Sequence, residues 1–111
     1  MQAPLEITPL EVKRRIDAGE PLRLIDVREP AEHAIARIEG AELIPMGSVP
    51  AHLQHIEGLA DAGTLVVFCH AGVRSLNVVV WLREQGLEAC QSMAGGIDRW
   101  SEEVDTSAPR Y

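Results

Sequence analysis

The sequence predicts an α/β fold in which a mostly parallel sheet lies between helices on both faces. Short apolar segments that favour strands alternate along the chain with segments that favour helices, an order typical of parallel sheets. The 111 residues correspond to one domain of ordinary size, which we expect to span residues 1–111, with residues 105–111 as an extended tail.

The composition narrows the class of partner. Hydrophobic residues make up 46% and charged residues 24% of the chain, as in soluble globular proteins, and the net charge is −7. An acidic chain is a poor match for nucleic acid or an anionic membrane surface. Residues 1–10 lack the features of a signal peptide, and no apolar stretch is long enough to cross a bilayer. We therefore expect a cytoplasmic protein with free thiols.

The first predicted helix spans residues 7–19. Thr8 has the position of an N-cap, and Glu11 completes a capping box with it. Val12 and Ile16 are four residues apart, so we expect them to form the apolar face of this helix.

Further elements follow from the same kind of pattern. Strands are expected at residues 22–27, 42–45, 64–68 and 88–93. Helices are expected at residues 30–38, 48–59, 74–85 and 97–104. The segment 74–85 contains a β-branched run, but its length and the glycine that follows it favour a helix, and its wide apolar surface predicts burial on more than one side.

A carboxylate interrupts the strand at residues 22–27. Asp26 stands near the end of an apolar run, where a buried charge needs a partner. A structural ion pair or hydrogen-bonded cap is favoured over a direct catalytic role, and Arg28 is more consistent with pairing to an acid than with lining the mouth of a site.

A thiol follows the most apolar strand. Residues 64–68 lead directly into Cys69, and a short loop with a glycine then leads into a helix. A loop of this kind can point its backbone N–H groups inward, and the helix that follows adds the positive end of its dipole. Such a cradle stabilises a thiolate, so the segment predicts that Cys69 is a nucleophile for an anionic substrate, and an inert core thiol is the alternative. Ligands of parallel sheets bind beyond the carboxyl ends of the strands, which is where Cys69 is placed.

The loop residues have distinct expected roles. Their backbone N–H groups, from His70 to Ser75, form the cradle, and Gly72 allows the tight turn. Arg74 either contacts the substrate or braces the loop, for example against Asp26, and Ser75 is expected to cap the helix. His70 faces either the mouth of the pocket or solvent. The predicted substrate-binding residues are thus His70, Ala71, Gly72, Val73, Arg74 and Ser75.

These residues resemble the active-site loop of the rhodanese family, Cys-x-x-Gly-x-Arg-Ser. Further segments resemble landmarks of the same family in the same order, so that the resemblance covers nearly the whole chain. They are Asp26 to Pro30, Ile38 to Ala41 with Ile44-Pro45, and Ala94 to Ile97 with Trp100. The resemblance implies a rhodanese-like three-layer fold with a five-stranded central sheet.

The resemblance also implies a thiosulfate sulfurtransferase activity without a metal or cofactor. Cys69 would take the sulfane sulfur from a small anionic donor such as thiosulfate and hold it as a persulfide. A thiol, cyanide or a ubiquitin-like sulfur-carrier protein would then accept the sulfur. The carrier enters because Gly95 to Trp100 and the tail to Tyr111 are similar to the end of rhodanese domains found with carrier-activating enzymes.

Two other functions compete with this one. Related phosphatases and arsenate reductases place the arginine six residues after the cysteine, whereas Arg74 is five after Cys69, and the smaller cradle suits a sulfur atom better than a phosphoryl group. A sulfur-relay or protein-binding module without turnover on thiosulfate is the other alternative, and it is suggested by the low positive charge of the loop, which offers little to attract a dianion.

Cys90 is interpreted as a buried thiol without a redox role. His52 and His55, three residues apart on a predicted helix, fit a solvated face better than a metal site.

Overall fold

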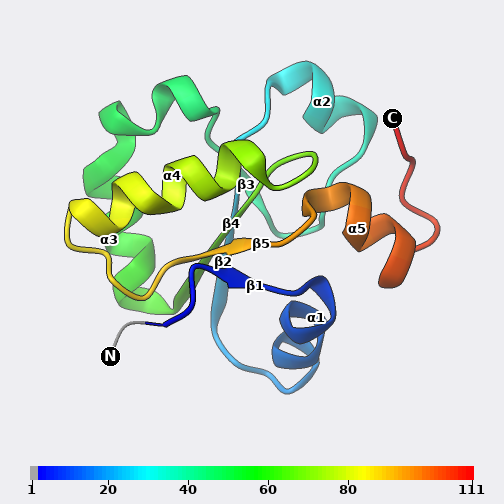
Figure 1. Cartoon of the computed structure of the whole chain (residues 1–111), viewed down its shortest axis with the longest axis horizontal. Coiled ribbons are helices and arrows are strands. Elements are labelled where there is room, and N and C mark those ends of the chain that lie inside the picture. The colour runs from blue at the N-terminus through cyan, green and yellow to red at the C-terminus, as the bar shows by residue number, and fades with distance from the viewer. Residues whose placement is uncertain (1–2) are drawn as a thin grey trace.

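The computed structural model describes residues 3–111, which form five parallel strands and five α-helices around one sheet (Figure 1). The strands lie in the order β1-β5-β4-β2-β3, and every pair is parallel. In chain order they are β1 Glu6–Ile7, β2 Leu22–Asp26, β3 Glu42–Leu43, β4 Thr64–Phe68 and β5 Gln91–Met93. The predicted parallel sheet is therefore confirmed.

Helices cover both faces of this sheet. In chain order they are α1 Pro9–Asp17, α2 Pro30–Ile35, α3 Leu53–Ala62, α4 Val73–Glu84 and α5 Gly96–Glu103. One core cluster joins α3 and α4 to one face of the sheet, and a second joins α1 and α5 to the other (Figure 1). Because both faces are covered, the central strand β4 is apolar and buried from Leu65 to Phe68. No helix among residues 3–111 is long and apolar enough to span a membrane.

The N-terminal region differs from its prediction in two ways. Thr8 caps α1 as expected, since its hydroxyl oxygen accepts a hydrogen bond from the Glu11 N–H at 3.2 Å. The helix begins at Pro9, and Glu6–Ile7 instead form the edge strand β1 beside β5. Val12 is fully buried, but Ile16 is 39% exposed, so the expected apolar face is only partly buried.

Two more helices differ from the predictions. The segment expected as one helix at residues 48–59 opens with two short 3₁₀ turns, Met46–Ser48 and Pro50–His52, and only then becomes α3. Pro50 cannot donate a backbone hydrogen bond, which suits the first turn of a helix but not its interior. Helix α4 forms despite its β-branched residues, but Val73 and Val80 are exposed, so its predicted burial on more than one side is wrong.

The register of the sheet places the ends of β2 and β4 side by side. Asp26, the last residue of β2, lies opposite Phe68, the last residue of β4. The Val27 N–H donates to the Phe68 carbonyl oxygen at 3.0 Å, which continues the pairing by one residue. Cys69 therefore leaves the sheet next to the Asp26–Arg28 turn, at the carboxyl edge where the general rule for parallel sheets places ligands.

Candidate active site around Cys69

The sulfur of Cys69 lies at the base of a tight loop. Residue Gly72 has a φ of +103°, which turns the chain back toward Cys69 and lets α4 begin at the next residue. The Gly72 and Ser75 N–H groups donate to Cys69 Sγ at 3.1 and 3.4 Å. Two backbone donors aimed at one sulfur stabilise its negatively charged form more than its neutral form. Cys69 is only 1% exposed, so little water competes for these donors.

The Ser75 side chain belongs to the sulfur site and does not cap the helix. Gly72 is the N-cap of α4, so the prediction of a Ser75 cap is wrong. The Ser75 hydroxyl instead donates to the Gly72 carbonyl oxygen at 3.3 Å and lies 3.4 Å from Cys69 Sγ. It also bonds to the hydroxyl of Ser92 on β5 at 2.8 Å. Both serines are fully buried, so these hydrogen bonds hold the Ser75 hydroxyl in a fixed position beside the sulfur.

Helix α5 holds the loop from the opposite side. The Ile97 N–H donates to the Cys69 carbonyl oxygen at 2.9 Å, and the Asp98 N–H donates to the His70 carbonyl oxygen at 3.0 Å. These N–H groups belong to the first turn of α5 and have no partner within the helix. These two bonds hold the Cys69 and His70 backbone against α5, next to the Gly72 and Ser75 N–H groups that are directed at the sulfur.

This close approach requires glycine at residue 96. A Cβ atom there would lie 2.4 Å from the carbonyl oxygens of both Cys69 and His70. Gly96 also has a φ of +60°. The Gly-Gly pair noted in the sequence therefore serves the packing of α5 against the loop.

Arg74 makes no hydrogen bond to the Cys69 sulfur and pairs instead with Glu32 on α2. Its Nη1 and Nη2 donate to Oε1 and Oε2 of Glu32 at 2.7 and 2.9 Å. The suggested brace to Asp26 is wrong, since this two-bond contact joins α4 to α2 instead. The Arg74 guanidinium lowers the pKa of Glu32 to about 2, and Glu32 in turn raises the pKa of Arg74.

Asp26 and Arg28 form a buried pair beneath the loop. Arg28 Nε and Nη2 donate to the two Asp26 oxygens at 2.9 and 2.7 Å, and both side chains are fully buried. Arg28 also donates to the carbonyl oxygens of Ala36 and Glu32, at 2.6 and 3.2 Å. His33 Nδ1 lies 3.0 Å from the second Asp26 oxygen. The contacts match the structural roles favoured from the sequence, because they tie the end of β2 to α2.

The tail returns to the mouth of the site. The Tyr111 hydroxyl donates to Glu32 Oε2 at 2.9 Å and accepts from Arg28 Nη1 at 2.8 Å. Its ring lies 4.3 Å from the imidazole of His70, centroid to centroid. Figure 1 shows the tail passing from α5 toward α2. Burial raises the pKa of Tyr111, and its bond to Glu32 acts in the same direction.

Sequence reasoning missed three residues of this network. Glu32, Tyr111 and Ser92 lie 37, 42 and 23 positions from Cys69 in the chain, outside any local motif. Glu32 had one local signal, because it forms a capping box with Glu29 at the start of α2. Ser92 carried no pattern that distinguishes it from an ordinary strand serine, and Tyr111 was noted only as the end of the tail, without a role at the site.

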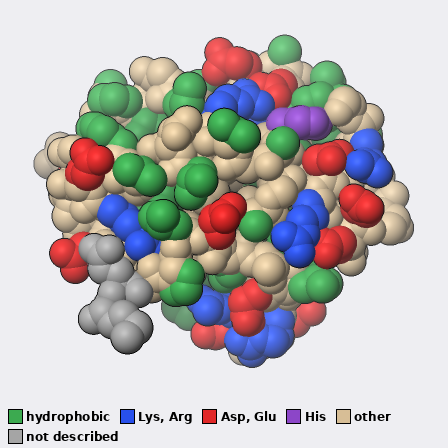
Figure 2. All heavy atoms as spheres, in the orientation of Figure 1, with side chains coloured by type: hydrophobic (Ala, Val, Ile, Leu, Met, Phe, Trp, Pro, Cys, Tyr) green, Lys and Arg blue, Asp and Glu red, His purple; other side chains and the backbone are tan. Residues whose placement is uncertain are grey.

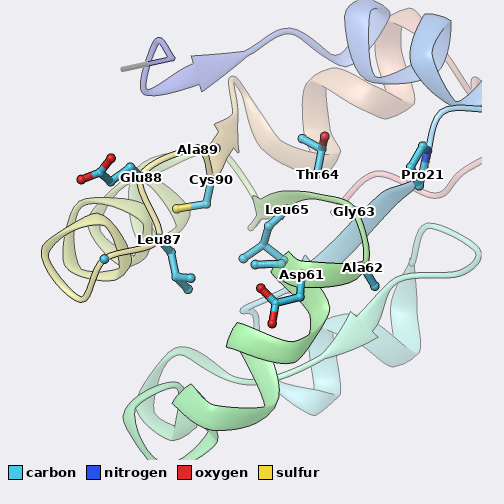
Figure 3. Close-up of a pocket in the computed structure, with 12 residues that line it drawn as sticks. Pro21, Asp61, Ala62, Gly63, Thr64, Leu65, Leu87, Glu88, Ala89 and Cys90 are labelled. Carbon is cyan, nitrogen blue, oxygen red and sulfur yellow. The ribbon is translucent and has the colours of Figure 1, made fainter. Parts of the chain in front are cut away.

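Cys90 lies at the other end of the sheet from Cys69. It contributes to a depression of about 580 Å³ together with Thr64, the first residue of β4, whereas Cys69 follows the last (Figure 3). Burial raises the pKa of the Cys90 thiol. The lining of this depression also includes the acids Asp61 and Glu88. A neutral thiol beside carboxylates is poorly suited to nucleophilic attack on an anion.

The two histidines of the 3₁₀ turn and α3 bind different partners. His52 Nδ1 lies 2.8 Å from the Ser48 carbonyl oxygen, and His55 Nε2 lies 2.7 Å from Glu42 Oε2.

On the face shown in Figure 2, basic side chains lie next to acidic ones. The positive charge near the candidate site is likewise paired, since Arg28 and Arg74 each contact a carboxylate.

Comparison with known proteins assigns the family. The model of the Rhodanese-like domain matches residues 8–103. The putative sulfurtransferase YtwF of Bacillus subtilis is 39% identical over 99 residues, which cover 89% of this chain and 92% of YtwF. The probable adenylyltransferase/sulfurtransferase MoeZ of Mycobacterium tuberculosis is 35% identical over 108 residues, which cover 95% of this chain. This chain spans about a quarter of the length of MoeZ, since the match covers 26% of it.

Solved structures agree with this assignment. SSP1007 of Staphylococcus saprophyticus superposes with a TM-score of 0.78 at 37% identity, over 91% of this chain and 97% of that one. The human single-domain sulfurtransferase TSTD1 superposes with a TM-score of 0.77 at 28% identity, over 91% of this chain and 98% of that one. The sheet, the cysteine loop and these matches together establish that the chain belongs to the rhodanese-like domain family, which includes proteins named as sulfurtransferases.

Proposed function

We propose that this protein transfers sulfane sulfur through a persulfide on Cys69. The observation that carries the proposal is the pair of N–H groups, from Gly72 and Ser75, directed at Cys69 Sγ. They stabilise the thiolate that attacks, and the same donors suit the persulfide anion that forms. Val73 and Arg74 lie in the first turn of α4, where N–H groups have no acceptor within the helix, so they would supply further donors for an anionic substrate.

The proposed reaction has two steps. The Cys69 thiolate attacks the terminal sulfur of a donor such as thiosulfate, the S–S bond of the donor breaks, and sulfite leaves with the bonding electrons. A thiophilic acceptor then attacks the outer sulfur of the persulfide and restores the thiolate. Cyanide or a small thiol serves as acceptor, and a ubiquitin-like carrier protein is the acceptor suggested by the tail.

Intact mass of the reduced protein tests this directly. Incubation with thiosulfate is expected to add one sulfur atom, and cyanide is expected to remove it as thiocyanate. Cys69→Ala abolishes the gain, whereas Cys90→Ala leaves it unchanged, which makes Cys90 the matched control thiol. Sulfur on the Cys69→Ala protein, or none on the wild type with any sulfane donor, contradicts the proposal.

A sulfur-relay module is the second candidate. The contact that favours it is Arg74 with Glu32, which leaves the loop without an unpaired arginine for a dianion. In this case Cys69 receives sulfur from a protein persulfide and loads poorly from thiosulfate. Incubation with a persulfide-carrying protein donor, followed by the same mass measurement, separates the two candidates.

A further inference from the structure

The one arginine of the cysteine loop is neutralised by a carboxylate from another helix. Arg74 donates both Nη groups to Glu32, at 2.7 and 2.9 Å. The two side chains are 32% and 21% exposed, so the pair lies at the edge of the site and not deep in the core. The guanidinium fork and the carboxylate match one another, which makes this contact more directional than a single ion pair.

Glu32 is fixed in this position by two further donors. The Glu29 N–H donates to Oε1 at 3.1 Å, and the Tyr111 hydroxyl donates to Oε2 at 2.9 Å. Glu32 therefore cannot swing away from Arg74 without losing bonds to α2 and to the tail. The pKa of Glu32, about 2, keeps it charged at every pH at which the protein is expected to work.

The other arginine near the site offers no replacement charge. Arg28 is fully buried and pairs with Asp26 at 2.7 Å. The chain as a whole carries a net charge of −7. An incoming donor therefore meets backbone N–H groups and the neutral Arg74–Glu32 pair, and each additional negative charge on it is repelled by an acidic protein.

We propose that Glu32 is a specificity-determining residue that selects the sulfur donor by charge. By pairing with Arg74, it favours donors with one negative charge over dianions such as thiosulfate. This inference rests on the proposed persulfide chemistry of Cys69 and adds the class of donor to it. Glu32 acts through Arg74 and takes no part in the chemical step.

Two donors that differ by one charge isolate the effect. Thiosulfate is a dianion that leaves as sulfite, and methanethiosulfonate is a monoanion that leaves as methanesulfinate. In both reactions the Cys69 thiolate attacks the terminal sulfur, the same type of S–S bond breaks, and the leaving group takes the electron pair. The ratio of their second-order rate constants for sulfur loading therefore reports charge selection.

The test compares this ratio in the wild type, Glu32→Gln, Glu32→Gln with Arg74→Gln, and Glu88→Gln. Glu32→Gln frees the charge of Arg74, so we expect the ratio of thiosulfate to methanethiosulfonate to rise about tenfold at low salt and less at high salt. The double variant removes both charges, and its ratio is expected to return to within about twofold of the wild type. Glu88→Gln makes the same charge change on the depression at the far end of the sheet and is expected to leave the ratio unchanged.

The outcomes separate this inference from the function it rests on. Both donors are measured on one preparation, so a reduced folded fraction cancels in the ratio. If neither donor loads Cys69 in the wild type, the proposed chemistry is wrong. If both donors load it but Glu32→Gln leaves the ratio within twofold, only the role of Glu32 is overturned. An equal rise in Glu88→Gln also overturns it, because the effect is then one of net charge alone.

Discussion

Among the residues around the candidate site, Arg28 is the one whose replacement is expected to destabilise the fold most. Replacement by lysine keeps the positive charge but concentrates its donors on one nitrogen. Arginine at this position contacts Asp26 through two nitrogens and also reaches the carbonyl oxygen of Ala36 and the Tyr111 hydroxyl. Lysine can keep one contact to Asp26, and it leaves the others without their donor.

The size of the loss follows from burial. Arg28 and Asp26 are both fully buried, so water does not replace the missing hydrogen bonds. A buried acceptor left without its partner costs about 1–3 kcal/mol. Breaking a buried ion pair costs about 3–5 kcal/mol. Since lysine retains part of the pair and loses several acceptors, we expect Arg28→Lys to lower the free energy of unfolding by about 3 kcal/mol.

Urea unfolding followed by circular dichroism measures this change. With a slope of about 1.5 kcal/mol per molar urea, a loss of about 3 kcal/mol lowers the midpoint by roughly 2 M. Arg23→Lys is the matched control, because Arg23 lies exposed on β2, the strand that precedes Arg28, and we expect a change within about 0.5 kcal/mol. If Arg28→Lys lowers the free energy of unfolding by less than about 1 kcal/mol at an unchanged slope, the proposed stabilising role of this arginine is refuted.

Three further predictions concern the contacts around the loop. The pKa of Glu32 lies at about 2, below its ordinary value of 4.5. The charged Glu32 therefore stabilises the folded protein above about pH 4.5, and this contribution is lost as the pH falls toward 2. The difference in free energy of unfolding between the wild type and Glu32→Gln, measured with urea, should shrink by up to about 3 kcal/mol over this range. Tyr111 is the one tyrosine of the chain, so the near-ultraviolet absorbance of tyrosinate should give a midpoint above 10 that falls in Glu32→Gln, and an unchanged midpoint would contradict their hydrogen bond. Gly96→Ala should lower the free energy of unfolding by more than about 2 kcal/mol, because its Cβ would lie 2.4 Å from two carbonyl oxygens. The same variant should also lose the sulfur loading of Cys69. Gly40→Ala, at a φ of +84° with nothing within 4 Å of the new Cβ, controls for backbone strain, and equal losses in both variants would contradict the steric argument.

The central part of the fold is readable from the sequence because its signals are local. Strand β4 runs over the predicted residues 64–68, and α4 lies within one residue of its predicted bounds. The apolar run, the glycine of the loop and the glycine after the helix all act on neighbouring residues. Strand β1 has no such signal, since it is two residues long and exists only because β5 lies beside it.

The candidate site is only half visible in the sequence for the same reason. Cys69 and Gly72 belong to one short motif that is recognisable in the sequence, and in the structure the Gly72 N–H donates to the Cys69 sulfur. The partner of Arg74 was not predictable, because several acids precede it and the choice of Glu32 depends on how α2 packs at the carboxyl edge of the sheet. Tyr111 reaches the site from 79 residues beyond Glu32, a distance over which no periodicity or cap gives information.

Charged side chains and backbone groups have different roles at this site. The ion pairs of Arg28 and Arg74 connect β2, α2 and α4, but each contains its own counter-charge and so adds little net field. The partial charges of the Gly72 and Ser75 N–H groups have no such counter-charge and are directed at the sulfur. Dipoles act over short distances, whereas the net charge of −7 acts over the whole molecule. An anionic sulfur is therefore stabilised once it lies in the loop, although the protein as a whole does not attract anions.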